Sequence, residues 1–195
     1  MAEGAESIRR RTGGRSARIR EQVFGAVLQE LVAHGLSGLT LPAIAQRAGV
    51  HPTTLYRRWP DPEALALDAI RDRSMTQVAI PDTGTLAGDL TRFLTDLDAY
   101  VRSPLGRALL ALQLTARGET DRIRQAFWRE RFELSAAMIE RAKSRGEIPA
   151  TTAARPLLEF AVAPVYLHAA VLGDGLDQHS IALSVRRTIA LAQAG

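Results

Sequence analysis

Apolar residues recur every three or four positions along most of the chain, which is the spacing of one face of an α-helix. The first such run extends from about Ala17 to His34, and its apolar stripe comprises Ile19, Val23, Phe24, Val27, Leu28, Leu31 and Val32. Beyond residue 84 no segment shows the two-residue alternation of a half-buried strand. The pattern predicts an all-α protein with about nine helices.

Residues 39–59 predict two short helices joined by a tight turn. Thr40 is suited to cap the first helix, whose apolar face comprises Leu41, Ile44, Ala45 and Ala48. Gly49 follows, and glycine readily adopts the left-handed conformation with which many chains leave a helix. Pro52 suits the first position of the second helix, because the N–H that proline lacks has no helical partner there.

The second helix of this pair carries Leu55 and Trp59 as an apolar pair one turn apart. Hydroxyl, aromatic and arginine side chains are left for its other faces. Two short helices with this turn and this composition are typical of a helix-turn-helix, whose second helix enters the major groove of DNA. We therefore expect the chain to bind DNA.

A further helix is expected after Asp61, which can cap it, with Pro62 in its first turn. It should end before the Pro-Asp-Thr-Gly sequence at residues 81–84, which is the clearest linker in the chain. We accordingly expect three parts: a disordered basic arm (1–16), a DNA-binding domain (17–77) and a second helical domain (78–195).

Five helices are expected in the second domain. One carries Leu86, Leu90, Phe93, Leu97 and Tyr100 on a single face and stops at Ser103-Pro104. The next should end at Gly118, and a long helix should follow from about Thr120 to Arg145. That long helix has two apolar stripes, Ile123/Phe127/Leu134/Met138 and Trp128/Phe132/Ile139, so it should contact two surfaces.

The last two helices predict an interface with a second copy of the chain. The helix over residues 152–172 is apolar on almost every side, with an expected kink at Pro164, and Asp177 should cap the final helix. A helix without a polar face needs a cover beyond its own subunit's core. We expect a two-fold homodimer through these two helices, although ordinary monomer core would give the same pattern.

The formal net charge of +4 is unevenly distributed. Residues 1–59 hold nine arginines and four glutamates, whereas the rest of the chain holds 16 basic and 17 acidic residues. The excess lies with the helix-turn-helix, where it could neutralise phosphates, although a solvated basic face would look the same. The sequence contains no cysteine, and we expect no signal peptide because no apolar run follows the first arginines. The most apolar stretch, 157–172, is shorter than the ~20 residues of a membrane span. We expect a cytoplasmic protein with no membrane partner.

An enzyme is the main alternative from another functional class. The sequence has no recognisable nucleophile–base pair, no His-Glu-x-x-His motif and no phosphate-binding glycine loop. Its four histidines are scattered without the spacing of metal ligands. We expect no catalytic residue, metal or cofactor. A DNA-binding protein that senses nothing is the second alternative.

The sequence LTLPAIAQRAGVHPTTLYRRWPDPEAL, from Leu39, resembles the DNA-binding domain of the tetracycline-repressor (TetR) family. The resemblance implies a three-helix DNA-binding domain followed by a variable helical domain that binds ligands and dimerises. It implies that Thr40 and Tyr56 hold phosphates and that Arg57 reaches a phosphate or a guanine. It also implies that four residues at the start of the second helix face base edges or the adjacent DNA backbone, namely His51, Pro52, Thr53 and Thr54. Trp59 should pack inside the domain.

The resemblance further implies a homodimeric repressor that a small molecule releases from a double-stranded operator. A small hydrophobic or aromatic effector would suit a pocket lined by aromatic side chains with a few polar groups. The candidate pocket residues are Phe93, Tyr100, Gln113, Trp128, Phe132, Tyr166 and His168. Residues of these types at helical spacing are also typical of an ordinary hydrophobic core. His168 in particular could be a histidine of the core or of an interface. An activator, or a dimer without an effector, remains an alternative.

Overall fold

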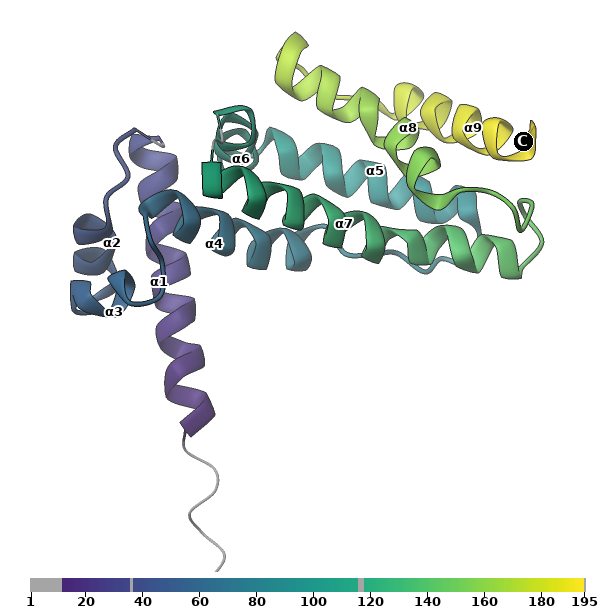
Figure 1. Ribbon diagram of the computed structural model, residues 1–195. Coiled ribbons are helices and arrows are strands. Elements are labelled where there is room, and N and C mark those ends of the chain that lie inside the picture. The colour runs from purple at the N-terminus through teal and green to yellow at the C-terminus, as the bar shows by residue number, and fades with distance from the viewer. Residues whose placement is uncertain (1–11, 36, 116–117, 195) are drawn as a thin grey trace, which may run out of the picture. The chain divides into compact units, whose positions relative to one another are not determined.

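The computed structural model describes residues 12–35, 37–115 and 118–194 (Figure 1). Within these ranges the chain forms nine α-helices, one π-helical turn and no strand, which confirms the predicted all-α class. The helices of the first half are α1 (Thr12–His34), α2 (Leu41–Ala48), α3 (Pro52–Tyr56) and α4 (Pro62–Gln77). Those of the second half are α5 (Leu86–Arg102), α6 (Pro104–Thr115), α7 (Gly118–Ser144), α8 (Ala154–Leu167), the π-helical η1 (His168–Leu172) and α9 (Gln178–Ala194).

The chain divides into two compact units, Met1–Ala69 and Ile70–Gly195. The division falls inside α4, so this helix begins in the first unit and ends in the second. The domain boundary expected at residue 77 coincides with the last residue of the same helix, and it stays a prediction.

The starts of α1 and α7 differ from the expected ones. Residues 1–11 of the expected arm lie outside the described residues, but 12–16 belong to α1 and not to a disordered segment. No proline interrupts this stretch, so the helix can extend through it, although its two glycines, Gly13 and Gly14, are poor helix formers. Gly118 begins α7 instead of ending α6, and Asp121 near that start suits the positive end of the helix dipole.

The first unit is built on the apolar face of α1, which packs against α2. That face is nearly solvent-free at Val23, Phe24, Val27 and Leu31, as the periodicity predicted, but Val32 of the predicted stripe is 49% exposed. The opposite side of the core is formed by Ile44 and Leu55, both completely buried. The small unit thus has a continuous core that can hold α2 and α3 rigidly.

In the second unit α5 is the central helix and packs against α6, α7, α8 and α9. Its predicted apolar face is confirmed, because the five side chains that define it are at most 5% exposed: Leu86, Leu90, Phe93, Leu97 and Tyr100. The last helix is capped as expected, since Asp177 Oδ1 accepts from the Ser180 N–H at 2.7 Å. α8 and α9 lie side by side (Figure 1).

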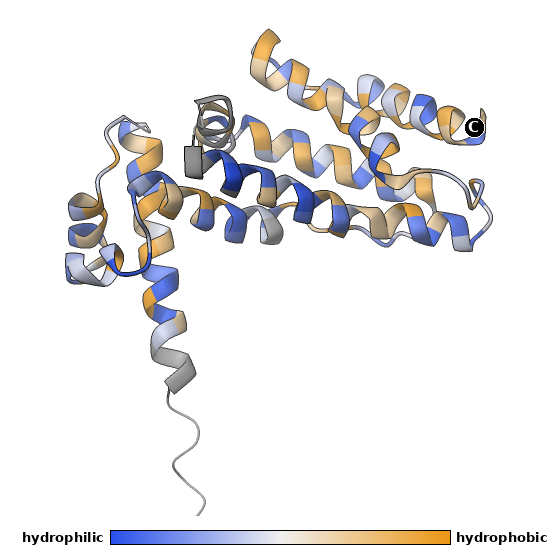
Figure 2. Ribbon diagram, in the orientation of Figure 1, coloured by the Kyte–Doolittle hydropathy of each residue, from blue (hydrophilic) through white to orange (hydrophobic). Residues whose placement is uncertain are grey.

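The end of α8 keeps a large apolar surface in solvent. After Pro164 the helix continues only to Leu167, and the next five residues form the π-helical turn η1. Figure 2 shows hydrophobic residues along the length of α8 and η1. The most exposed large apolar side chains of this region are Phe160, Leu167, Val171, Leu172 and Leu191. By length and composition Ala154–Leu172 could also cross a membrane, a criterion that helices of soluble proteins meet as well.

Gly25, in the middle of α1, gives a prediction about stability. A Cβ atom built on Gly25 meets nothing within 4 Å, so alanine fits without a clash. Because glycine inside a helix is about 0.5–1 kcal/mol less favourable than alanine, Gly25→Ala should raise the free energy of unfolding by that amount. Urea denaturation would measure it. Gly49→Ala is the control, and it should lower the free energy of unfolding, because φ at Gly49 is +65° and a side chain there is strained. If both variants change the free energy of unfolding in the same direction, this explanation is wrong.

Candidate nucleic-acid interface and apolar pocket

Short caps fix the geometry of α2 and of the turn that follows it. Thr40 Oγ1 accepts from the Ala43 N–H at 3.3 Å, so the hydroxyl keeps its own proton for another acceptor. At the other end Gly49 adopts φ +65°, and Val50 N–H donates to the Ala45 carbonyl at 3.0 Å. The predicted cap and turn are therefore confirmed, and the chain reverses directly into α3.

α3 is held from its inner side by Leu55 and by the residues that follow the helix. The sequence predicted that Trp59 lies on this helix. The helix ends at Tyr56, however, so Trp59 follows it. Trp59 is nonetheless 7% exposed: its indole N–H donates to Asp68 Oδ2 at 3.3 Å, and its ring lies 6.2 Å from that of Phe24. The packing role expected for Trp59 is confirmed, but a turn supplies it and not the helix.

His51 caps α3 and thereby fixes the roles of its own ring nitrogens. Its Nδ1 accepts from the Thr53 N–H at 3.4 Å and lies 2.9 Å from Thr53 Oγ1. With Nδ1 as an acceptor, the neutral ring carries its proton on Nε2, which can donate to a nucleic-acid acceptor. The Thr53 hydroxyl, if it donates to Nδ1, presents its oxygen as an acceptor.

The seven residues expected at DNA fall into two places in the first unit. Thr40 stands exposed at the start of α2, whereas the other six run from the N-cap to the C-cap of α3. Exposed side chains in this segment are His51, Thr53, Tyr56 and Arg57, while Pro52 and Thr54 are half-buried. Six of the seven residues therefore lie on one short segment, which is compact enough to enter a single major groove of DNA.

The basic residues of the first unit differ in how their charge is balanced. Arg47 pairs with Glu30, a carboxylate that is buried and also lies 3.5 Å from His34 Nε2. Arg57 and Arg58 are exposed at the end of α3, with the Arg58 guanidinium 5.1 Å from the centre of the Trp59 ring. The positive charge next to α3 is therefore available to phosphates at Arg57 and Arg58, whereas that of Arg47 is largely neutralised.

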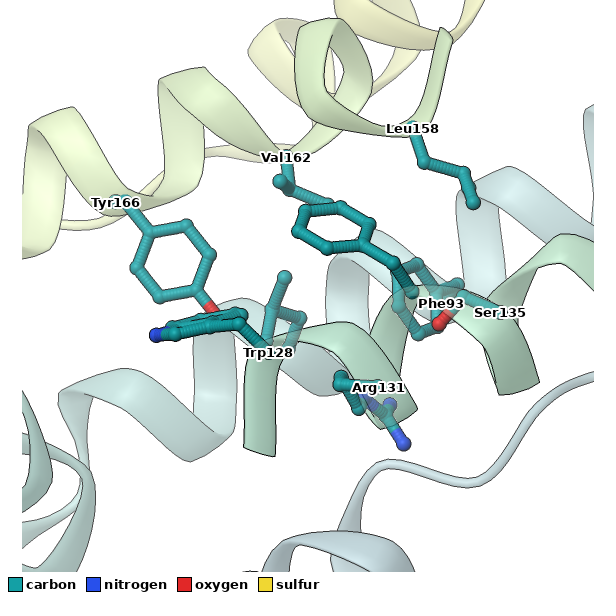
Figure 3. A pocket seen from close by; sticks show the side chains of 9 residues that line it. Phe93, Trp128, Arg131, Ser135, Leu158, Val162 and Tyr166 are labelled. Atoms are coloured by element: carbon teal, nitrogen blue, oxygen red, sulfur yellow. The ribbon is translucent and has the colours of Figure 1, made fainter. Parts of the chain in front are cut away.

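The second unit contains a pocket between α5, α7 and α8 (Figure 3). It is lined by Phe93, Leu97, Trp128, Arg131, Phe132, Ser135, Leu158, Val162 and Tyr166, and its volume is about 20 Å³. The Trp128 ring lies 5.5 Å from Tyr166 and 6.0 Å from Phe132. In this closed form the pocket has room for about one water molecule, so a larger ligand needs its walls to move apart.

Four of the seven residues expected in a ligand pocket line this one, namely Phe93, Trp128, Phe132 and Tyr166. Tyr100 is buried outside the lining, its hydroxyl has no hydrogen-bond partner among the described residues, and burial raises its pKa to about 12. His168 lies elsewhere, with Nδ1 2.8 Å from Asp174 Oδ1. The Gln113 side chain is outside the described residues.

Two polar residues of the lining were missed from the sequence, Arg131 and Ser135. Arg131 is 7% exposed, and its Nη2 donates to the Val78 carbonyl at 2.6 Å. Burial lowers the pKa of Arg131 below the ordinary arginine value. Both residues follow Trp128 at helical spacing, three and seven positions on, so this spacing was the available signal.

Comparison with known proteins supplies the family. The profile described as "Bacterial regulatory proteins, tetR family" matches residues 26–69, and "Tetracyclin repressor-like, C-terminal domain" matches residues 80–188. The chain belongs to the tetracycline-repressor (TetR) family. TetR-family proteins are DNA-binding transcriptional regulators and not enzymes, which excludes the catalytic alternative.

Relatives and solved structures agree over most of the chain. It is 33% identical over 164 residues to the HTH-type transcriptional regulator AqdR of Rhodococcus erythropolis, covering 83% of this chain and 79% of AqdR. The TetR-family regulator SCO0332 is 29% identical with a TM-score of 0.75, covering 89% of this chain and 97% of that one. A transcriptional regulator FadR of Bacillus subtilis, solved with stearoyl-CoA, is 14% identical with a TM-score of 0.65, covering 90% and 98%, and shows the shared fold.

Proposed function

We propose that this TetR-family regulator is a cytoplasmic homodimeric repressor that a small hydrophobic or aromatic molecule releases from its operator. The observation that carries the ligand half of the proposal is the aromatic pocket of the second unit. FadR of Bacillus subtilis, which shares the fold, was solved with stearoyl-CoA, and this supports a ligand-binding role for the second unit. A repressor bound over a promoter would block transcription until the ligand lowers its affinity for DNA.

A thermal-shift screen of small apolar compounds, followed by a DNA-release assay, tests this proposal. We expect at least one compound both to raise the melting temperature and to weaken binding to the operator, since the conformation that binds the ligand should differ from the one that binds DNA. Stabilisation without DNA release would contradict the regulatory role. Neither effect across a broad library would favour the alternative of a dimer without an effector.

The interface of the homodimer would be the apolar surface of α8, η1 and α9. Val171 is 71% exposed and Leu172 57%, which is unusual for large apolar side chains grouped on one surface. A C2 interface needs one self-complementary patch, and two helices from each copy would form a four-helix bundle.

Val171→Glu combined with Leu172→Glu should give a monomer, because four carboxylates would be desolvated in a C2 interface. Light scattering would measure the mass, and operator affinity should fall by at least about tenfold because two half-sites are no longer held together. The matched control is Leu134→Glu, an exposed leucine on α7 that should leave the dimer intact. A double variant that stays dimeric would place the interface elsewhere.

At the DNA, we assign Tyr56 to a phosphate and the threonines of α3 to base edges. Tyr56→Phe removes one hydroxyl from a side chain that is 56% exposed, so it should weaken binding to all duplexes alike, by about two- to tenfold. Thr53→Val and Thr54→Val should instead change the preference among sequences selected from a random duplex pool. If the tyrosine and threonine variants shift affinity and preference in the same way, these roles are wrong.

Two contacts inside the second unit would connect the pocket to α4. Arg131, which lines the pocket, donates to the carbonyl of Val78 directly after this helix. Arg71 in the last part of α4 donates to Glu130 through both Nε and Nη2, at 2.6 and 2.7 Å. A ligand that displaced α7 would therefore act on the end of a helix whose beginning belongs to the DNA-binding unit.

A further inference from the structure

The polar groups of the pocket indicate the chemical class of its ligand. Arg131 brings a guanidinium into a lining that otherwise consists of apolar and aromatic residues and one serine. Its Nη2 is used by a neutral acceptor, the Val78 carbonyl, and its Cζ lies 5.4 Å from the centre of the Phe93 ring. A buried guanidinium is a planar set of donors that binds anionic oxygens strongly where water is excluded.

Two of the ionisable groups that act on Arg131 are phenols, those of Tyr166 and Tyr100. Tyr100 is buried and Tyr166 is half-buried, and loss of solvent around the phenols raises the pKa of each, to about 12 for Tyr100. At neutral pH both are therefore uncharged and do not neutralise the guanidinium. An anionic ligand group in the pocket would be attracted by the positive charge of the Arg131 guanidinium.

Ser135 provides a second polar group on the same side of α7. It lies four residues after Arg131 and therefore on the same face of the helix. Ser135 is 2% exposed, and its hydroxyl has no hydrogen-bond partner among the described residues although it lines the pocket. Buried hydroxyls without a partner are uncommon and unfavourable, so a ligand oxygen that accepted from Ser135 would be bound selectively.

The remaining walls favour a flat ring. Phe93, Trp128 and Phe132 present aromatic surfaces, and Figure 3 shows Trp128 and Tyr166 close together above Arg131. Aromatic side chains stack on planar ligands in offset or edge-to-face geometry. Trp128 and Phe132 are only half-buried, which leaves them room to move when a ligand opens the pocket.

We propose that the pocket binds a planar aromatic ligand that carries an anionic oxygen group, with Arg131 binding this group and Ser135 donating to it. The inference rests on the proposal that this pocket is the effector site. It adds the charge of the ligand, which the fold alone does not specify.

Isothermal titration calorimetry with three matched probes tests the inference on the wild-type protein. We expect 2-naphthoate to bind at least about tenfold more tightly than the neutral 2-naphthylmethanol, because only the carboxylate can pair with Arg131. We also expect it to bind more tightly than decanoate, which has the charge without the ring. Equal binding of the acid and the alcohol, decanoate as the best ligand, or no binding of any probe would each overturn the proposed ligand class.

Variants identify the residue that binds the anion. Arg131→Met should remove the preference for 2-naphthoate and leave the affinity for 2-naphthylmethanol nearly unchanged, whereas Arg131→Lys should keep part of the preference. Ser135→Ala should lower the affinity for 2-naphthoate by a smaller factor. Arg129→Met, an exposed arginine on the same helix, is the matched control and should change neither affinity. A preference that survives in Arg131→Met would overturn the assignment.

A separate measurement distinguishes failure of this inference from failure of the proposed function. Binding of the ligand-free protein to its selected duplex, and loss of that binding in the Val171→Glu/Leu172→Glu variant, test the dimeric regulator without any probe. If DNA binding behaves as expected while the probes show no preference for the anion, only the ligand class is wrong. Should Arg131→Met fail to fold, the wild-type probe series and Arg131→Lys still decide.

Discussion

Gly106→Ala should destabilise the second unit by about 3 kcal/mol or more, one of the two largest effects that we expect from any single substitution here. A Cβ atom at Gly106 would lie 2.0 Å from the Tyr100 carbonyl oxygen and 2.6 Å from the Val101 Cα. Both are backbone atoms of α5, so no side-chain rotation can relieve the overlap, and α6 would have to move away from the central helix of the unit.

Helix propensity predicts the opposite sign at this position, which makes the measurement decisive. Gly106 lies within α6, where alanine would ordinarily be about 1 kcal/mol more favourable than glycine. Urea denaturation followed by circular dichroism should show an earlier transition for the second unit of Gly106→Ala and a later one for the control Gly25→Ala. A stable Gly106→Ala protein would mean that α5 and α6 do not approach as closely as described.

Asp89→Ala should cost about 3 kcal/mol, because Asp89 is a fully buried carboxylate that joins three segments of the second unit. Its Oδ1 accepts from the Thr83 N–H at 2.6 Å and from the Thr83 hydroxyl at 2.8 Å. Its Oδ2 lies 3.6 Å from Arg141 and 3.8 Å from Arg145, both near the end of α7. Without the carboxylate, the linker before α5 loses its acceptor and two arginines lose a counter-charge.

The control for Asp89 is Asp96→Ala on the same helix. Asp96 also forms an ion pair, with Arg92 at 2.7 Å, but this pair lies at the surface. Surface pairs contribute little because water screens them, so the denaturation midpoint should be nearly unchanged. Asp89→Asn should fall between wild type and Asp89→Ala, since the amide oxygen can still accept from Thr83. Equal midpoints for Asp89→Ala and Asp96→Ala would show that burial does not set the strength of this pair.

Local sequence rules were sufficient for the helix-turn-helix, because each of its boundaries depends on a residue next to it. Thr40 caps α2, Gly49 reverses the chain, and His51 and Pro52 begin α3, all as the sequence predicted apart from the side chain that caps α3. The six residues of α3 and its caps that are expected at DNA lie together because they are close neighbours in the sequence. The burial of Trp59 was also predicted, but its position after the end of α3 and its contacts with Phe24 and Asp68 were not.

The pocket could be only half predicted. Four aromatic residues were found from their type and spacing, but Arg131 and Ser135 were missed because a polar residue on a long helix usually faces solvent. Arg131 is buried because its guanidinium meets the Val78 carbonyl from a segment 53 positions away. His168 was expected in the pocket but does not line it. This histidine on an apolar helix instead lies next to Asp174, which follows the next turn.

The sequence by itself determined the all-α class, the helix-turn-helix and most helix ends, because periodicity and capping act over a few neighbouring residues. The tertiary structure alone decided which side chains line the pocket, that Gly106 must be a glycine and that Asp89 is buried with its partners. These features depend on which helix faces which, and this is set by packing between segments far apart in the chain.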